Sequence, residues 1–295
     1  VTNKKYAALV HEQLPEIPEG NILQEPCRRN TAPCVAYISW RIKEKDARAN
    51  IVVTPSDHIV TNCNEFRRVI TSALKFTGET DSIVTLGMKP TRPETGYGYI
   101  QGDLSTPSAR NREIFRVDQF KEKPDLATAE KYVKDHNFFW NAGIFIMSAA
   151  TIVNAFRVYQ PGIAKIFESM RSIYGTEKEQ EQIDLRYPEC ENISIDYAIM
   201  EKAEEIFVFP ADFGWSDLGT WGSLLAQSKK DANGNATIGN NIQMIDSKNN
   251  IVHTLNEKKV VIQGLEGYII AEENGTLLIC KMSEEQNIKF FSGMN

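Results

Sequence analysis

Long apolar segments are missing from this sequence. No run approaches the roughly 18 apolar residues of a membrane-spanning helix. The opening residues, Val1-Thr2-Asn3-Lys4-Lys5, also lack the hydrophobic stretch of a signal peptide. These two absences argue against a membrane protein and favour a location in the cytoplasm.

Cysteine is sparse and irregularly placed. The 295 residues contain five cysteines, an odd number, and no two of them are spaced as C-x-x-C. The sequence therefore favours neither a disulfide framework nor a zinc site. We expect the five thiols to be reduced and partly buried.

An excess of basic residues is missing as well. The 33 Lys and Arg residues are outnumbered by 39 Asp and Glu residues, which gives a formal net charge of −6. Nucleic acids and anionic membrane surfaces attract basic proteins, so this balance argues against both as partners. An anionic substrate must instead be bound by local positive groups.

Helical patterns alternate with short apolar runs in the first part of the chain. Residues 31–45 and 64–76 carry apolar side chains at helical spacing, and the β-branched runs 49–54 and 81–86 follow them. Such alternation is typical of α/β domains with parallel strands. We predict a Rossmann-like mixed sheet, mainly parallel and flanked by helices. Further strands are expected at 97–101, 115–121, 138–147 and 206–210, and further helices at 4–14, 126–134, 151–174, 194–203 and 218–228.

The composition changes after Lys230. Short β-rich runs, broken by Asn, Gly and Lys, recur there about every ten residues. This spacing predicts a small all-β domain or a partial β-helix. We therefore predict a catalytic domain at residues 1–230 and a β-rich domain at residues 231–295. Exposed strand edges in the second domain would also allow a homodimer.

Two aspartates stand just beyond predicted strands. Asp57 follows the run ANIVVT, and Asp217 follows the run IFVFP in a turn rich in Gly and Trp. Open α/β sheets bind ligands at the carboxyl ends of their strands. Mg²⁺ is commonly bound by one or two carboxylates and phosphate oxygens, and Mn²⁺ accepts the same ligands. Each aspartate is thus either a metal ligand or a cap of the following segment.

Three motifs carry polar groups suited to a sugar phosphate. PETGYGYI holds Gly98, whose lack of a side chain permits a ligand to approach the backbone. KEKP offers Glu122 for sugar hydroxyls and Lys123 for a phosphate, and WNAGIF holds Asn141 among apolar residues. Ordinary solvated charges and a structural asparagine are the alternatives.

The motif EPCRRNTAP is a polar loop that enters a predicted helix. The Asn30 amide and the loop backbone could contact the edge of a base, and a helix N-terminus favours anions. The alternative is an ordinary helix cap.

Seven motifs occur together and in a fixed order between residues 21 and 225. With this set the chain resembles the bacterial mannose-1-phosphate guanylyltransferases of the nucleotidyltransferase superfamily. The motifs are EPCRRNTAP, PSDH, PETGYGYI, KEKP, WNAGIF, SIDYAIME and GWSDLGTW.

The resemblance implies a reaction and a set of site residues. Asp57 and Asp217 would be catalytic and hold Mg²⁺. Gly98, Glu122, Lys123 and Asn141 would line the mannose phosphate site, with Asp196 nearby. Pro26, Asn30 and Thr31 would contact guanine. The partners would be GTP and mannose 1-phosphate, and the products GDP-mannose and pyrophosphate.

The attacking group in such a reaction needs no general base. The second pKa of a phosphate is about 6, so mannose 1-phosphate is largely dianionic at neutral pH. The sequence accordingly has no Ser-His-Asp or Cys-His signature. Among the histidines only His58 lies in a motif, and we expect it to have a structural role or to support a metal ligand.

One departure from the family concerns its glycine-rich loop, which carries an Arg, ends in Pro-Lys and surrounds the triphosphate. No glycine in this sequence is followed by that pattern. Val1-Thr2-Asn3 resembles the end of a strand, so we expect the loop to lie upstream of Val1. Two alternatives stay open: a non-catalytic homologue that binds sugar nucleotides, and an enzyme for another sugar 1-phosphate, such as glucose 1-phosphate with UTP or dTTP.

Overall fold

The computed structural model describes residues 1–254 and 258–292. The chain forms two compact units, Val1–Pro55 with Asn62–Phe213, and Ser56–Thr61 with Gly214–Asn295. The second unit begins earlier than the predicted boundary at residue 231. The reason is that helix α8 (Trp221–Gln227) contributes Trp221, Leu224 and Leu225 to the apolar core of the later strands.

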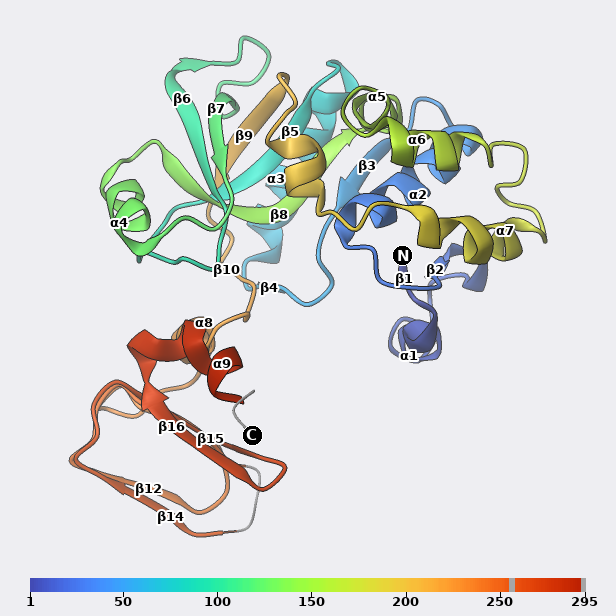
Figure 1. Cartoon of the computed structure of the whole chain (residues 1–295). Helices are drawn as coiled ribbons and strands as arrows, with labels where there is room; N and C mark the ends of the chain where they lie inside the picture. The colour runs from blue at the N-terminus through green and yellow to red at the C-terminus, as the bar shows by residue number, and fades with distance from the viewer. Residues whose placement is uncertain (255–257, 293–295) are drawn as a thin grey trace. The chain divides into compact units, whose positions relative to one another are not determined.

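A six-stranded mixed sheet forms the centre of the first unit (Figure 1). Its strands in spatial order are β3 (Asn50–Val53), β8 (Phe138–Ser148), β5 (Ile83–Met88), β9 (Ile206–Ala211), β7 (Phe115–Lys121) and β6 (Tyr99–Pro107). The predicted mixed α/β fold is confirmed.

We predicted a mainly parallel sheet, but most neighbouring strands of this sheet pair in the antiparallel direction. Among the described residues of this sheet, β5 and β9 form a parallel pair, and the other pairs are antiparallel. The strands β3 and β5 run in the same direction but do not pair, because β8 lies between them and is antiparallel to both. With 11 residues, β8 is also long enough to pair with β6.

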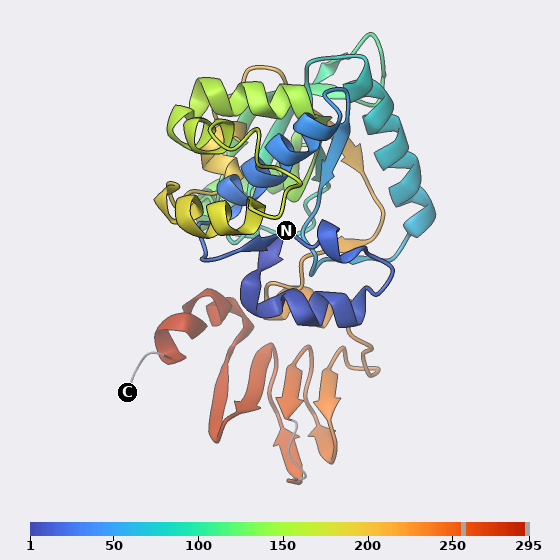
Figure 2. The same ribbon diagram turned by 90° about the vertical axis from the view of Figure 1, so that its right-hand side faces the viewer.

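Helices cover both faces of this sheet (Figure 2). Helices α2 (Thr31–Lys45), α5 (Ala149–Tyr159) and α6 (Pro161–Glu168) pack together on one face, and α3 (Cys63–Gly78) packs on the other. Trp40 and Phe156 are buried where α2 meets α5, because apolar residues recur on one side of each helix.

Two predicted helices differ from the observed ones. The single polar helix expected at 151–174 is two helices, because Pro161 has no N–H for the α5 ladder and begins α6 instead. Helix α5 is also apolar on its inner face, where Ile152 and Phe156 are fully buried. The helix expected at 194–203 is a short π-helical turn, Asp196–Met200.

The remaining elements of the first unit are short. Strand β1 (Thr2–Asn3) pairs in parallel with β2 (Gln24–Glu25). The further helices are α1 (Ala7–Gln13), α4 (Leu126–Lys134) and α7 (Glu179–Arg186), and 3₁₀ turns occur at Lys4–Tyr6, Glu19–Asn21 and Tyr187–Glu189. No helix in the described part of the chain is both long and apolar enough to cross a lipid bilayer.

The second unit is rich in β-strands that stack in register. Strands β11 (Ala236–Gly239), β13 (Ile251–Thr254) and β15 (Tyr268–Glu273) are parallel, and β16 (Thr276–Lys281) is antiparallel to β15. Strands β12 (Ile242–Ile245) and β14 (Val260–Gln263) form a second parallel pair. This arrangement matches the predicted partial β-helix. The unit also contains β4 (Ile59–Val60), β10 (Trp215–Ser216), a 3₁₀ turn at Met282–Asn287 and α9 (Ile288–Ser292).

A ladder of asparagines connects successive turns of these stacked strands. The Nδ2 of Asn250 donates to Asn235 Oδ1 and to the carbonyl of Leu265, both at 2.9 Å. Its Oδ1 accepts from the N–H of Tyr268 at 2.8 Å. Asn250 is fully buried, so its side chain satisfies backbone groups that water cannot reach.

We predict that Asn250→Ala lowers the free energy of unfolding by about 3 kcal/mol, because buried backbone groups would lose their partners. Urea denaturation measures this loss. Asn233→Ala, at an exposed asparagine of the same stacked region, is the control and should change stability by less than about 0.5 kcal/mol. Equal losses in the two variants would contradict the role of the ladder.

Candidate active site

The two aspartates with a predicted metal role lie at the same end of a short strand pair in the second unit. Strands β4 and β10 are antiparallel, with Trp215 opposite Val60 and Ser216 opposite Ile59. Asp57 precedes β4 and Asp217 follows β10 directly. In an antiparallel pair, these two positions belong to the same end. The pairing therefore brings together residues that are 160 positions apart in the sequence.

His58 lies between these carboxylates and the strand pair. Its Nδ1 accepts a hydrogen bond from Trp215 Nε1 at 3.1 Å, and its Nε2 is 3.9 Å from Asp57 Oδ1. Burial lowers the pKa of His58, while the charges of Asp57 and Asp217 act in the opposite direction. Both carboxylates therefore lie within electrostatic range of one imidazole, and the hydrogen bond to Trp215 fixes the orientation of that ring.

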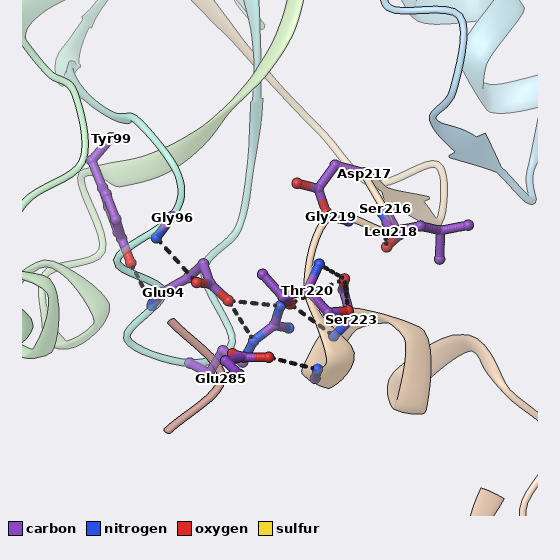
Figure 3. Close-up of polar contacts among 12 residues, drawn as sticks. Glu94, Gly96, Tyr99, Ser216, Asp217, Leu218, Gly219, Thr220, Ser223 and Glu285 are labelled. Atoms are coloured by element: carbon purple, nitrogen blue, oxygen red, sulfur yellow. Dashed lines mark hydrogen bonds and ion pairs between the residues drawn. The ribbon is translucent and has the colours of Figure 1, made fainter. Parts of the chain in front are cut away.

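Asp217 sits in a tight turn (Figure 3). Its Oδ1 accepts the N–H of Gly219 at 2.9 Å, and a Cβ added at Gly219 would lie 2.6 Å from Oδ2. A side chain at position 219 would therefore force the Asp217 carboxylate to move. Helix α8 is capped by Thr220, which forms a capping box with Ser223, whereas Asp217 caps the turn that precedes the helix, so the cap considered as an alternative is present.

The metal role of the two aspartates stays a prediction. Asp57 is 84% exposed at its side chain, so an incoming phosphate can reach it. Among residues 1–254 and 258–292, no group of three or more His, Cys, Asp and Glu side chains could hold a metal ion. Mg²⁺ usually takes one or two carboxylates and completes its six ligands with waters and the phosphate oxygens of a substrate.

The residues with a predicted role at the sugar phosphate lie together in the first unit, and we call them the sugar-phosphate cluster. They are Gly98, Glu122, Lys123, Asn141 and Asp196. A Cβ added at Gly98 would lie 2.5 Å from Glu122 Oε2 and 3.4 Å from Asn141 Cβ. The backbone of Gly98 is thus pressed against two other members, and its carbonyl accepts the N–H of Asn141 at 2.8 Å.

Asn141 is the central member of this cluster. Its Nδ2 donates to Asp196 Oδ1 at 2.9 Å. Its Oδ1 accepts from the N–H of Gly143 at 3.0 Å and from Thr85 Oγ1 at 3.4 Å. Asn141 therefore joins β8 to the π-helical turn that carries Asp196. Both the structural role and the ligand-binding role predicted for Asn141 are compatible with these bonds.

Glu122 and Lys123 form an ion pair with very different exposures. The Lys123 Nζ is 2.9 Å from Glu122 Oε1, while the Lys123 and Glu122 side chains are 60% and 10% exposed, respectively. The alternative of an ordinary solvated charge is therefore wrong for Glu122. The bond to Glu122 raises the pKa of Lys123, and the nearby charge of Asp196 raises it further. Lys123 thus offers an ammonium group to an anion beside this cluster.

Asp196 is the member of the cluster with a strongly perturbed carboxyl group. Its burial, together with the charge of Glu122, raises its pKa to about 6, while the bond from Asn141 and the charge of Lys123 oppose this shift. Perturbed carboxyl groups are frequent at functional sites. The carboxyl groups of Asp196 and Glu122 are both of a kind that accepts hydrogen bonds from hydroxyl groups.

The loop predicted to contact guanine is held to a segment of the same unit. Thr31 Oγ1 accepts the N–H of Ile195 at 2.8 Å, and Arg29 donates to the carbonyl of Pro188. Asn30 is the N-cap of α2 and has a φ of 64°. The helix cap considered as an alternative is therefore present. A contact of Pro26, Asn30 and Thr31 with a base stays a prediction.

Sequence reasoning missed two residues of this region. Thr85 on β5 is fully buried and donates to Asn141. Glu94 is 4% exposed and accepts the N–H of Gly96 at 3.1 Å. Glu94 could have been noticed in the sequence, because it is a charged residue just before two glycines. Thr85 gave no such signal, because its partner Asn141 lies 56 positions away.

We predict that the raised pKa of Asp196 makes the free energy of unfolding depend on pH. Its pKa rises from 3.8 to about 6 on folding, so the stability it contributes is present below pH 3.8 and is lost as the pH rises through about 6. Asp196→Asn, which keeps the acceptor for Asn141, should gain about 3 kcal/mol over the wild type between pH 4 and pH 7. Urea denaturation at several pH values measures this gain, and parallel curves for the two proteins would disprove it.

Comparison with known proteins supports the motif analysis. The Nucleotidyl transferase family matches residues 1–234. The chain is 33% identical to a mannose-1-phosphate guanylyltransferase of Escherichia coli, over 98% of this chain and 63% of that protein. It is also 33% identical to the alginate biosynthesis protein AlgA of Pseudomonas fluorescens, over 98% of this chain and 59% of that protein. The chain thus spans about three fifths of the length of these curated relatives.

A solved structure agrees with this result. The mannose-1-phosphate geranyltransferase from Thermus thermophilus matches with a TM-score of 0.80 at 26% identity, covering 98% of this chain and 81% of that chain. The resemblance to mannose-1-phosphate guanylyltransferases is confirmed. The chain belongs to the nucleotidyl transferase family.

Proposed function

We propose that the protein containing this chain transfers GMP from GTP to mannose 1-phosphate, giving GDP-mannose and pyrophosphate. The observation that carries the proposal is the convergence of Gly98, Glu122, Lys123, Asn141 and Asp196 in one cluster. The similarity to proteins named mannose-1-phosphate guanylyltransferase supports the choice of mannose and of guanine.

The cluster combines the chemistry that a sugar phosphate needs. Glu122 and Asp196 are acceptors for sugar hydroxyl groups, and the Lys123 ammonium provides a positive charge for the phosphate. The absence of a side chain at Gly98 lets Glu122 and Asn141 lie close to the backbone of the loop. In this proposal the cluster binds mannose 1-phosphate and orients its phosphate for attack.

The reaction is an in-line displacement. An oxygen of mannose 1-phosphate forms a bond to the α-phosphorus of GTP, and the bond between that phosphorus and the pyrophosphate oxygen breaks. Positioning and charge neutralisation supply most of the acceleration in such reactions. A phosphate with a second pKa of about 6 needs no base to remove a proton at neutral pH.

Asp57 and Asp217 would hold Mg²⁺ in this proposal. When bound, the cation neutralises charge on the phosphate oxygens. The chain itself contributes the two carboxylates, and His58 with its bond to Trp215 supports Asp57. The assignment of residues 1–230 to a catalytic domain, the contact of residues 26–31 with guanine, and a homodimer also belong to this proposal.

We predict that Asp57→Asn and Asp217→Asn each lower kcat for magnesium-dependent pyrophosphate release by at least about 100-fold, because a neutral amide binds Mg²⁺ poorly. A coupled pyrophosphate assay with GTP and mannose 1-phosphate measures the change in the full-length protein. Binding of mannose 1-phosphate without metal, measured by calorimetry, should be retained.

Asp81→Asn is the matched control, because Asp81 is an exposed aspartate next to β5. Its activity should equal that of the wild type. If Asp57→Asn and Asp217→Asn retained wild-type rates, the metal assignment would be wrong.

A substrate panel tests the identity of the sugar and the base. We predict that kcat/KM for mannose 1-phosphate with GTP exceeds that for glucose 1-phosphate with UTP or dTTP by at least about tenfold, a difference of about 1.4 kcal/mol in transition-state binding. The same pyrophosphate assay gives these values. A preference for either glucose combination would replace the proposed substrates and retain the reaction class.

A further inference from the structure

Glu94 is a buried carboxylate in the connection between β5 and β6. It is 4% exposed, and its two oxygens have different partners. Oε2 accepts hydrogen bonds from Nε and Nη2 of Arg92 at 3.2 and 3.1 Å. Oε1 accepts the backbone N–H of Gly96 at 3.1 Å (Figure 3). Glu94 therefore links a charged side chain to the backbone of the loop that leads to Gly98.

Aromatic and cationic groups surround Glu94. The Arg92 guanidinium lies 5.2 Å from the ring centroid of Trp140 and 6.0 Å from that of Tyr97. The backbone N–H of Glu94 donates to the hydroxyl of Tyr99 at 3.0 Å, and Tyr99 is fully buried. A buried carboxylate is stable only when it is paired and hydrogen-bonded. The position of the Glu94 carboxylate is therefore closely determined by these aromatic and cationic neighbours.

The loop from Gly96 to Gly98 ends at the sugar-phosphate cluster. The carbonyl of Gly98 accepts the N–H of Asn141, and a Cβ at Gly98 would lie only 2.5 Å from Glu122 Oε2. A glycine at this position therefore lets the Glu122 carboxylate lie beside the loop, and a shift of the loop would alter both this packing and the bond between Gly98 and Asn141. The geometry of the cluster thus depends on what holds the Gly96 end of the loop.

Glu94 and Arg92 do not themselves belong to that cluster. Arg92 stacks on Trp140, whereas the next residue of β8, Asn141, bonds to Asp196. Successive side chains of a strand point to opposite faces of the sheet. The Arg92–Glu94 pair and the Asn141–Asp196 pair therefore lie on opposite faces of β8, and the loop is the segment that Glu94 bonds directly and that reaches the cluster.

We propose that Glu94 is a positioning residue for sugar-phosphate binding, with Arg92 holding its carboxylate so that it fixes the Gly96–Gly98 loop against Glu122 and Asn141. This inference rests on the proposed function, in which the cluster binds mannose 1-phosphate. Neither Glu94 nor Arg92 contacts the substrate in this arrangement.

The chain contains a matched control for a buried glutamate of this kind. Glu179 is 7% exposed and accepts hydrogen bonds from Arg41, from the N–H of Gly175 and from the hydroxyl of Tyr37. Its carboxylate shares an arginine and a glycine N–H with that of Glu94, while Tyr37 donates to the carboxylate itself and Tyr99 accepts from the Glu94 backbone. Its helix, α7, contributes no residue to the sugar-phosphate cluster.

The experiment compares Glu94→Gln, Arg92→Lys and Glu179→Gln with the wild type in the full-length protein. The oxygen of a glutamine at position 94 can still accept the Gly96 N–H, but its NH2 group then faces Arg92 and can accept neither of the two arginine bonds. Lysine at position 92 keeps the positive charge but replaces the planar guanidinium with a single ammonium group. It therefore weakens the bonds to Glu94 while leaving the buried glutamate with a cation, so the variant should still fold. The readouts are KM for each substrate, kcat, the Kd of mannose 1-phosphate from calorimetry, and the thermal midpoint.

We expect Glu94→Gln to raise both KM and Kd for mannose 1-phosphate about tenfold. The reason is that residue 94, which holds the Gly96 N–H, loses its charge-assisted hydrogen bonds with Arg92. KM for GTP should stay within about twofold of the wild type, since the loop is assigned to the sugar phosphate alone. Arg92→Lys should shift the same constants in the same direction by a smaller factor. Glu179→Gln should lower the thermal midpoint and leave the constants for mannose 1-phosphate unchanged.

The outcomes separate this inference from the proposed function. If the wild type transfers GMP and the two loop variants bind mannose 1-phosphate as tightly as it does, the positioning role is wrong and the function stands. The same conclusion follows if Glu179→Gln and Glu94→Gln weaken mannose 1-phosphate equally. If the wild type releases no pyrophosphate but binds mannose 1-phosphate, and Glu94→Gln weakens that binding, the positioning role stands and the transfer function falls.

Discussion

The burial of three carboxyl groups is the constraint on which the sugar-phosphate cluster and its loop depend. Glu94, Glu122 and Asp196 are each removed from solvent to a large degree, and a buried carboxylate is stable only with compensating donors or cations. Glu94 is compensated by Arg92 and a glycine N–H, and Glu122 by Lys123. Asp196, with an amide from Asn141 and a carboxylate neighbour, is compensated incompletely, and its raised pKa expresses this. The cluster is therefore partly strained in its charged form, which a ligand that donates hydrogen bonds would relieve.

Strand β8 brings these groups together. It pairs with β3, β5 and β6, so segments from three distant parts of the chain align along one strand. Trp140 and Asn141 are neighbours in this strand but serve opposite faces of the sheet. Arg92 packs against Trp140 on one face of the sheet, and Asp196 of the π-helical turn bonds to Asn141 on the other. Strand β8 therefore contacts both groups: its Trp140 packs against Arg92, and its Asn141 belongs to the sugar-phosphate cluster.

The second unit depends on a different device. Its stacked strands are joined by Asn235 and Asn250, whose amides satisfy backbone groups at the turns between strands. The short pairing of β4 with β10 then places Asp57 and Asp217 at one end of a two-stranded element. Hydrogen bonds from Trp215 to His58 and from Gly219 to Asp217 fix the local geometry there. The second unit is thus held by side-chain amides and turn hydrogen bonds together with two apolar clusters between its strands.

The sequence by itself determined the features whose signal is local. The helices Thr31–Lys45 and Leu126–Lys134 form at the predicted residues, because their periodicity and capping residues lie within each segment. Motifs such as PETGYGYI and WNAGIF are read from neighbouring letters, so the sequence also indicated which residues carry the chemistry and to which family the chain belongs. Only the tertiary structure decided that β8 lies between β3 and β5, that Asn141 bonds to Asp196, and that Glu94 supports the loop. Strand partners, burial and charge pairing arise between residues that are distant in the chain, so they exist only once the sheet has assembled.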